Sequence, residues 1–258
     1  MSKFTKFAFC ICLCVLVLLS VTLIGCGDDT YRVHLFTSDG AAGSASGEGY
    51  YEHGTSVTVT ATPNPGYLFT GWYNFGSDTL ASSDANYTFT ITQDCTLTAK
   101  FELDPALSDF SYTLTTTACS ITGIKDKTKT ECTIPNSVTS IADDAFRDCT
   151  NLTSVTIGNG VKTIGFRAFK DCTALTNMTS PSSVTSIGNS AFYGCKIMRT
   201  VAMGNRVTSI GDSAFFNCSG LTEINYRGTQ TQWNAISKGN SWSNGAGHYT
   251  VIFNHSGE

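Results

Sequence analysis

Apolar residues in the C-terminal half of the chain recur at an interval of 23 residues. Within each unit the apolar positions lie two or three residues apart, which is too irregular for a long helix or a long strand. One such turn cannot bury its apolar side alone, whereas stacked turns share a continuous core. We therefore expect a solenoid in which each turn offers one short strand, a tight bend and a compact Ala-Phe segment. The repeated columns are Val138, Val161, Val184 and Val207; Ile141, Ile164, Ile187 and Ile210; Ala145, Ala168, Ala191 and Ala214; Leu152, Leu175, Met198 and Leu221; and Val155, Met178, Val201 and Ile224.

Two further columns carry one aromatic ring and one thiol per turn. Because turns of a stacked sheet lie about 4.8 Å apart, each ring and each thiol should meet its equivalent inside the solenoid. Parallel side chains leave successive Cβ atoms about 5 Å apart, farther than the roughly 3.8 Å that a disulfide prefers. We therefore expect buried free thiols that pack as small hydrophobic groups. This structural ladder consists of Phe146, Phe169, Phe192, Phe215, Cys149, Cys172, Cys195 and Cys218.

Residues 31–102 have a different pattern, without the 23-residue interval. Val and Thr alternate over 56–61, as in a half-buried strand, and 87–91 and 97–101 predict two more strands. Residues 63–66 form a turn signal. These features indicate a small all-β domain, and residues 103–109 are a plausible linker to the solenoid at 110–254. Trp72 in the small domain is expected to be a core aromatic, with stacking on a sugar as the alternative.

The repeat units carry a family resemblance. The segments Ile134–Ile141, Ala145–Cys149 and Ile187–Cys195 resemble the BspA-type leucine-rich repeat of bacterial surface proteins, and the resemblance extends over about residues 110–254. It departs at Ser180 and Pro181, where the family favours an apolar residue before proline. The resemblance implies a mainly β fold with short helices: a small all-β domain followed by a leucine-rich-repeat solenoid.

Both ends of the solenoid are predicted to be capped. Residues 110–124 lack the Phe and Cys columns and are expected to form strands over the first turn. Residues 226–236 resemble the terminal cap of the same family, in which a short helix bearing Trp233 would cover the last turn. Residues 248–253 would add a final strand.

The small domain resembles a second family. Gly54, Val57–Val59, Gly66-Tyr67, Gly71-Trp72 and Thr98–Phe101 follow one another as in the divergent internalin-B-type repeat domain of bacterial surface proteins. The resemblance covers the whole of 31–102. It implies a compact β module that serves as a spacer or in adhesion.

The first residues have the layout of an export signal. Lys3 and Lys6 precede an uncharged apolar stretch over 7–24, which predicts a secretory signal. An uncleaved transmembrane helix is the alternative, because the stretch is near the length needed to span a bilayer. Residues 23–26 resemble the bacterial lipobox, which implies a signal peptide over 1–25, lipid attachment at Cys26 and a short tether over 26–30. We therefore expect an exported protein, anchored by lipid to the bacterial membrane.

Charge and composition argue against several functions. Charged residues make up only 14% of the chain and the net charge is −4, without a basic stripe for nucleic acid. No residue spacing fits a cofactor, a metal centre or a catalytic group, so we expect no enzyme, no cofactor and no metal. The column of Asp148, Asp171 and Asn217 could hold calcium, but such residues more often cap a bend. The histidines are scattered, at His34, His53, His248 and His255.

The candidate binding surface consists of the positions between the apolar columns, which should face solvent. It is rich in Thr, Ser and Asn and poor in the aromatic and Arg anchors of tight interfaces. Adhesion to a protein or glycan is the function that the family resemblance implies; a structural or envelope scaffold is the alternative. A carbohydrate-active enzyme is disfavoured because no paired carboxylates are placed for it. The surface residues are Ser154, Thr156, Asn177, Thr179, Thr200, Glu223 and Asn225, beside a second polar strip of Thr139, Lys162, Thr185 and Thr208.

Overall fold

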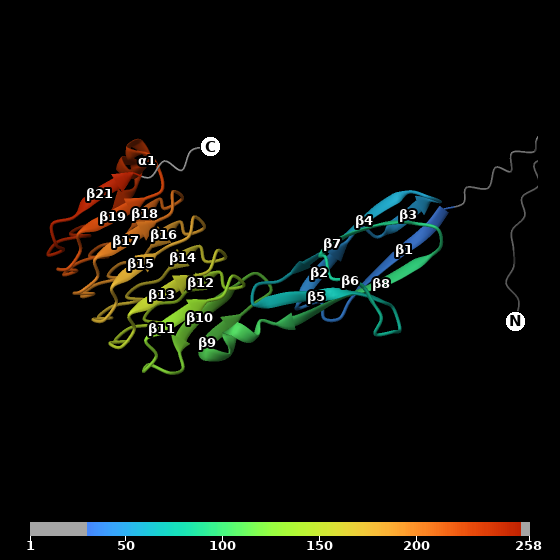
Figure 1. Cartoon of the computed structure of the whole chain (residues 1–258), viewed down its shortest axis with the longest axis horizontal. Helices are drawn as coiled ribbons and strands as arrows, with labels where there is room; N and C mark the ends of the chain where they lie inside the picture. Colours follow the sequence, from blue (N-terminus) through green and yellow to red (C-terminus); the bar gives the residue numbers. More distant parts are fainter. Residues whose placement is uncertain (1–29, 254–258) are drawn as a thin grey trace, which may run out of the picture.

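The computed structural model describes residues 30–253, which form a small β domain and a β-solenoid joined end to end (Figure 1). The proposed signal peptide and the lipid-attachment residue Cys26 lie outside the described residues. Within 30–253, no helix has the length and apolar character needed to cross a membrane. The described part contains one α-helix, α1 (Gln230–Ala235), and one 3-10 helix, η1 (Pro105–Asp109). The predicted fold class is confirmed.

The small domain packs two antiparallel-rich sheets around a buried tryptophan. The larger sheet has the order β3-β1-β8-β5-β6 and the smaller one β2-β4-β7. Along β4, burial alternates so that Val57, Val59 and Ala61 face the core. Trp72 is fully buried and its Nε1 donates a hydrogen bond to the Ala85 carbonyl at 3.3 Å, so it is a core aromatic. The strands are β1 (Thr30–Thr37), β2 (Gly43–Ser46), β3 (Gly49–Glu52), β4 (Ser56–Pro63), β5 (Tyr67–Asn74), β6 (Leu80–Ser82), β7 (Asn86–Thr90) and β8 (Cys95–Leu103).

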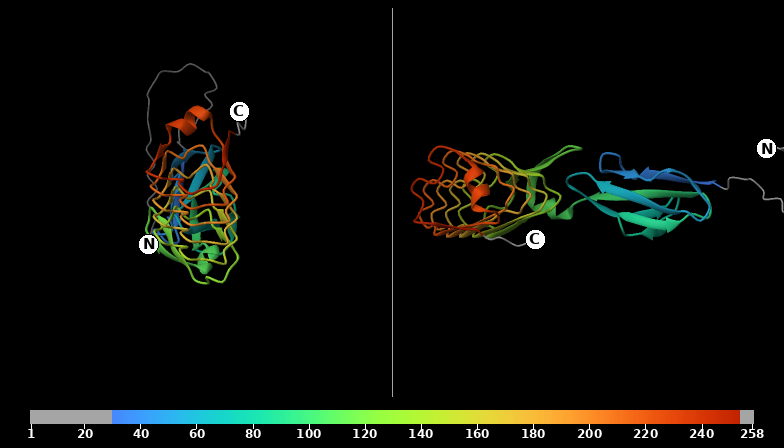
Figure 2. Two further views of the ribbon diagram at one scale, coloured as in Figure 1. Left: turned by 90° about the vertical axis from the view of Figure 1, so that its left-hand side faces the viewer. Right: turned by 90° about the horizontal axis from the view of Figure 1, so that it is seen from above.

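Each turn of the solenoid contributes two strands, rather than the single strand expected. A two-residue strand, such as β14 (Thr163–Ile164), joins one parallel sheet, and a strand of three or four residues, such as β13 (Ser154–Ile157), joins the other. Two residues are too few to show the period-two alternation of a strand. Figure 2 shows the coils lying one on the next, with α1 over the last of them. This confirms the stacking that the 23-residue interval predicts.

The first solenoid sheet, formed by the short strands, begins with an antiparallel pair at the N-terminal end. The second sheet is parallel throughout the described residues. The first sheet contains β9 (Phe110–Leu114), β10 (Cys119–Ile124), β12 (Ser140–Ile141), β14 (Thr163–Ile164), β16 (Ser186–Ile187), β18 (Ser209–Ile210) and β20 (Ser237–Lys238). The second contains β11 (Glu131–Ile134), β13 (Ser154–Ile157), β15 (Asn177–Thr179), β17 (Thr200–Met203), β19 (Glu223–Tyr226) and β21 (Thr250–Phe253).

The phenylalanine column forms a continuous stack in the core. Its four rings are buried, with centroids 4.9, 5.2 and 5.1 Å apart and interplanar angles of 7°, 4° and 7°. At each end a differently oriented ring closes the stack. Phe110 meets Phe146 at 75°, and Trp242 meets Phe215 at 89°. The stack therefore begins and ends on edge-to-face contacts, which aromatic rings favour over a face-to-face sandwich.

The cysteine column does more than fill space. The thiols of Cys172, Cys195 and Cys218 each donate a hydrogen bond to the carbonyl of the column phenylalanine in the preceding turn, at 3.1, 3.2 and 3.1 Å. The seven cysteines within 30–253 are free thiols. Burial raises the pKa of Cys172 and of Cys218 to about 12. The thiol thus satisfies a buried carbonyl while remaining neutral.

Threonine hydroxyls make further bonds between turns. In the polar strip, the hydroxyls of Thr139, Thr185 and Thr208 donate to backbone carbonyls one turn earlier, at 2.9, 3.1 and 3.1 Å. Thr176 and Thr222 do the same at another corner of the coil, at 3.1 Å each. Part of the threonine enrichment is therefore structural, because these hydroxyls satisfy carbonyls at the bends.

The column of Asp148, Asp171 and Asn217, in which the sequence allows a calcium ladder, lies at a bend with left-handed backbone. Asp148, Asp171 and Asn217 have φ values of 59°, 57° and 58°, and Gly194 occupies the same place at 74°. Asp, Asn and Gly are the residues that tolerate this conformation best. Within 30–253, no group of three potential metal ligands comes together. The column is explained by backbone geometry.

Residues 103–109, expected to be a linker, form an ordered junction between the two domains. Leu103 ends β8, and Asp104 is buried, with its carboxylate accepting hydrogen bonds from the Ala106 amide at 2.9 Å and the Ser137 hydroxyl at 2.7 Å. Gly66 of the small domain donates its amide to the Ser137 carbonyl at 2.9 Å. The solenoid and the small domain are thus held together by direct hydrogen bonds.

Replacement of one ring in the stack should strongly destabilise the solenoid. Phe192→Ala is expected to lower the free energy of unfolding by about 3–5 kcal/mol, because it leaves a cavity in a closely packed core. Phe216→Ala is the matched control, since Phe216 stacks on Tyr193 at the partly exposed side of the coil. Urea denaturation measures both; equal losses for the two variants would contradict the central role of the stack.

The buried thiols should make stability fall in alkaline solution. In the unfolded chain these thiols ionise near their ordinary pKa of 9.0, whereas Cys172 and Cys218 stay protonated in the folded chain up to about 12. Rising pH therefore favours the unfolded state between about pH 9 and pH 12. The urea midpoint should drop over this range, and less steeply in a Cys172→Ala/Cys218→Ala variant. Identical pH profiles for both proteins would refute this origin of the drop.

Candidate binding face of the solenoid

The seven residues of the candidate surface lie on one face of the second solenoid sheet, in two rows. Ser154, Asn177, Thr200 and Glu223 are register partners across β13, β15, β17 and β19. The second row runs parallel to the first and includes Ala202 as a small member. Its members are Thr156, Thr179, Ala202 and Asn225.

The strand pattern explains why these side chains point outward. In β13, Val155 and Ile157 are buried in the core, while Ser154 and Thr156 alternate with them toward solvent. The same alternation holds along β15, β17 and β19. None of the seven side chains is buried. We call this surface, formed by the seven residues with Ala202, the binding face.

Part of the binding face is hollowed. A depression of about 400 Å³ is lined by Ser154, Thr156, Asn177 and Thr179, which are four of the seven predicted residues. The rest of its lining consists of Val155, Ile157, Asn159, Pro181 and Arg227. The lining does not include Thr200, Glu223 or Asn225. The predicted surface is therefore one face with a local hollow at its N-terminal half.

Arg227 is the residue of the hollow that sequence reasoning missed. It follows β19, two turns beyond Pro181, and the position between them in the same column is Gly204, which has no side chain. In the first four turns this column carries only Pro135, Gly158, Pro181 and Gly204. The sequence did contain a signal for this residue, because Arg227 is the one arginine in a column that otherwise holds proline and glycine.

The third turn departs from the family pattern at Ser180, directly after β15. Ser180 is completely buried in a column that is otherwise apolar, and its hydroxyl accepts a hydrogen bond from the Gly204 amide at 3.3 Å. Its own amide donates to the Ala202 carbonyl at 2.8 Å. Strand β15 has only three residues here. The serine is thus tolerated because both of its polar groups find backbone partners.

The hydrogen-bonding groups of the binding face are only partly used within the protein. The Thr200 hydroxyl donates to the Asn177 side-chain oxygen at 2.5 Å, and Asn225 bonds to Glu223. Within the described residues, Arg227 takes part in no side-chain hydrogen bond or ion pair. No carboxylate and no histidine lines the hollow. The hollow can therefore donate hydrogen bonds and offer one positive charge, but its lining contains no nucleophile with an adjacent base.

The histidines lie elsewhere. His34 contacts Glu48 at 2.7 Å on the small domain, where the hydrogen bond from His34 holds the pKa of Glu48 below its ordinary value. His53 packs edge-on against Tyr31. His255 lies outside the described residues. Neither His34 nor His53 lies on the binding face.

Two family models match the chain. Residues 124–238 match the BspA type leucine rich repeat region in six copies, and residues 33–105 match the divergent InlB B-repeat domain. No curated protein shows significant similarity to the chain.

Solved structures similar to the chain are bacterial leucine-rich-repeat proteins. The leucine rich repeat protein of T. pallidum is 22% identical with a TM-score of 0.42, and the match covers 54% of this chain and 82% of that one. A leucine rich cell surface protein of Faecalibacterium prausnitzii is 30% identical with a TM-score of 0.38, over 52% of this chain and 42% of that one. A leucine-rich repeat protein of Eubacterium ventriosum is 25% identical with a TM-score of 0.38, over 50% and 39%. The chain thus spans less than half the length of the latter two.

The repeat columns and the stacked coils agree with the two family matches. Residues 33–105 are similar to the divergent InlB B-repeat domain, and residues 124–238 are similar to the BspA-type leucine-rich repeat region.

Proposed function

We propose that this protein is a lipid-anchored surface protein that mediates adhesion, and that its solenoid binds a protein or glycan partner through the binding face. The observation that carries the proposal is the hollow, where four predicted face residues meet an arginine that has no partner within 30–253. Leucine-rich repeats build extended sheet surfaces of this kind for binding.

The chemistry of the face favours a partner with many hydrogen-bonding groups. Hydroxyls and amides of Ser154, Asn177 and Thr179 both donate and accept, whereas Arg227 adds a planar donor suited to a carboxylate. Aromatic anchors are absent from the lining of the hollow. We therefore expect modest affinity at a single site, strengthened where several copies act together.

The sequence of the first residues supports the location. The lipobox-like segment before Cys26 implies diacylation of that cysteine, and several buried acyl chains hold a protein firmly on a membrane. The described part begins at Thr30, so the small domain would lie next to the membrane, with the solenoid beyond it (Figure 1).

A binding screen tests the face directly. The chain from Gly27 onward, immobilised, is presented with extracellular-matrix proteins and a glycan array. For any partner found, Thr179→Tyr should weaken binding about tenfold or more, because the ring fills the hollow. Thr163→Tyr is the matched control, an exposed strand threonine on the other sheet. If both variants bind as tightly as the parent, the hollow is not the site.

A scaffold role within the envelope is the second candidate, favoured by the lack of aromatic anchors on the binding face. Protease treatment of intact cells separates the two. Adhesion requires exposure, so we expect shaving to release solenoid peptides detectable by mass spectrometry. A protein that stays intact in unbroken cells, but is cleaved after lysis, would rule out adhesion and leave the scaffold role.

A further inference from the structure

The N-terminal end of the second solenoid sheet has an open edge. In the first sheet, β9 pairs antiparallel with β10 and covers its end, whereas β11 pairs only with β13 within the described residues. The Thr130 carbonyl accepts from the Thr153 amide, toward β13. Because backbone groups alternate along a strand, the amides and carbonyls of Glu131 and Thr133 point to the opposite, open side.

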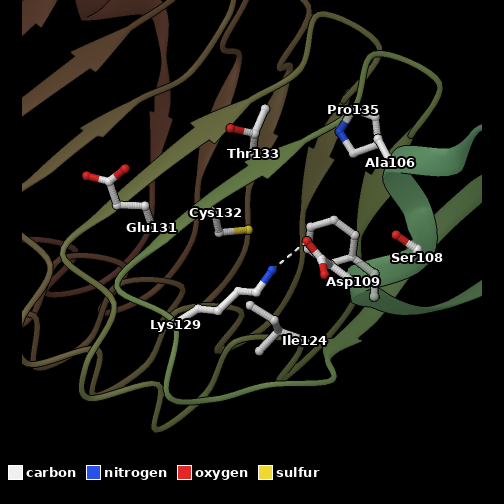
Figure 3. Close-up of a pocket in the computed structure, with 10 residues that line it drawn as sticks. Ala106, Ser108, Asp109, Ile124, Lys129, Glu131, Cys132, Thr133 and Pro135 are labelled. Carbon is white, nitrogen blue, oxygen red and sulfur yellow. Dashed lines mark hydrogen bonds and ion pairs between the residues drawn. The ribbon is translucent and has the colours of Figure 1, made fainter.

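A pocket lies beside this edge, between β11 and η1 (Figure 3). Its volume is about 300 Å³. Phe110, Ile124 and Cys132 are each almost fully buried and form its apolar wall. Burial raises the pKa of Cys132 to about 12, so this thiol is neutral and lines the pocket as an apolar group.

Polar groups surround the mouth of the pocket. Lys129 reaches across to Asp109 of η1, with 2.6 Å between Nζ and the carboxylate (Figure 3). Glu131 of β11 also lines the pocket, with its side chain directed away from the Lys129–Asp109 pair (Figure 3), and forms no ion pair within 30–253. With one cation and two carboxylates, the mouth carries a net negative charge.

We propose that the edge of β11 and this pocket form a binding site for an extended peptide segment of a partner protein, added as a further strand to the sheet. The open amides and carbonyls would bind the peptide backbone, and the pocket would take one of its bulky apolar side chains. Addition of a strand to a sheet edge, with pockets for alternate side chains, is an established mode of peptide recognition. This pocket shares no lining residue with the hollow of the binding face, although β11 pairs with β13, whose Ser154 and Thr156 line the hollow.

The ladder itself indicates the sequence that fits. Every strand of this sheet places an apolar residue in the column of Cys132, namely Val155, Met178, Val201, Ile224 and Val251. A strand stacked on β11 would continue that column and direct an apolar side chain into the pocket. The neighbouring residue would face Glu131 across the strands, where an opposite charge is favourable. We therefore expect the partner segment to have a basic, an apolar, a polar and an apolar residue in this order.

The surroundings favour a single peptide strand over a second solenoid. The small domain is attached at this same end by the hydrogen bond from Gly66 to Ser137 and by the buried Asp104 (Figure 1). Helix η1 forms the opposite wall of the pocket. These two elements leave the edge of β11 accessible to one strand and obstruct the stacking of a whole coil from another copy.

Fluorescein-labelled hexapeptides test the site in titrations with the chain from Gly27 onward. The parent peptide is Thr-Lys-Phe-Thr-Val-Thr, and its companions replace phenylalanine by alanine, or lysine by glutamate. We expect saturable binding of the parent, about tenfold weaker binding with alanine, and severalfold weaker binding with glutamate. Absence of saturable binding of the parent up to millimolar concentration would overturn the proposal.

Two protein variants locate the binding. Thr133→Pro removes an amide on the open side of β11, and should abolish binding while the fold persists, because edge strands tolerate proline. Phe253→Pro makes the same change in β21, at the other end of the sheet. The Thr250 amide donates toward β19, so alternation turns the Phe253 amide to the open side, and this variant should leave binding intact. Glu131→Lys, an exposed substitution that spares the backbone, should reverse the preference between the lysine and glutamate peptides. Equal loss in both proline variants, or an unchanged charge preference, would refute the site.

Discussion

The contact between one coil and the next is the interaction on which every other feature of the solenoid depends. Flush stacking puts each phenylalanine ring about 5 Å from its equivalent, and it brings each thiol within hydrogen-bonding distance of a carbonyl in the preceding turn. Between Phe146 and Phe215 both contacts recur with 23 residues per turn, whereas the end turns have other lengths, with 20 residues from Ile121 to Ile141 and 28 from Ile210 to Lys238. One inserted residue in a strand would turn its apolar set outward. The constant interval is thus a direct consequence of interior packing.

The exterior of the solenoid follows from the same constraint. Since the apolar columns are fixed inward, the residues between them form continuous rows on the outside, and small changes in one row reshape the surface locally. Gly204 and Ala202 leave space in the rows that lead to Arg227, and the buried Ser180 shortens β15 beside them. The hollow therefore arises from a few substitutions in the repeated rows, one of which, Ser180, lies in the core.

Most of the fold could be read from the sequence because core columns repeat in phase. The stack of phenylalanines and the buried Trp72 were predicted from apolar spacing and local signals, and the capping helix with Trp233 was predicted from the family resemblance. The second strand of each turn was missed because a strand of two residues is too short to show an alternation of buried and exposed positions. The bonds of Cys195 and Thr208 to carbonyls one turn earlier were also missed, because composition alone does not reveal which polar partner lies nearby. Four of the seven face residues line the hollow, but Arg227 reaches it across two turns, a relation that depends on three-dimensional proximity.

The rotated rings of Phe110 and Trp242 give the solenoid a defined length. A parallel ring can always receive another above it, whereas a perpendicular ring presents its edge and offers no equivalent surface for the next lap. Gene duplication could therefore lengthen this protein only by inserting whole units between the two closing aromatics. The number of turns can therefore change in the middle of the solenoid but not at its ends. Each turn gained or lost lengthens or shortens the exposed rows by one residue.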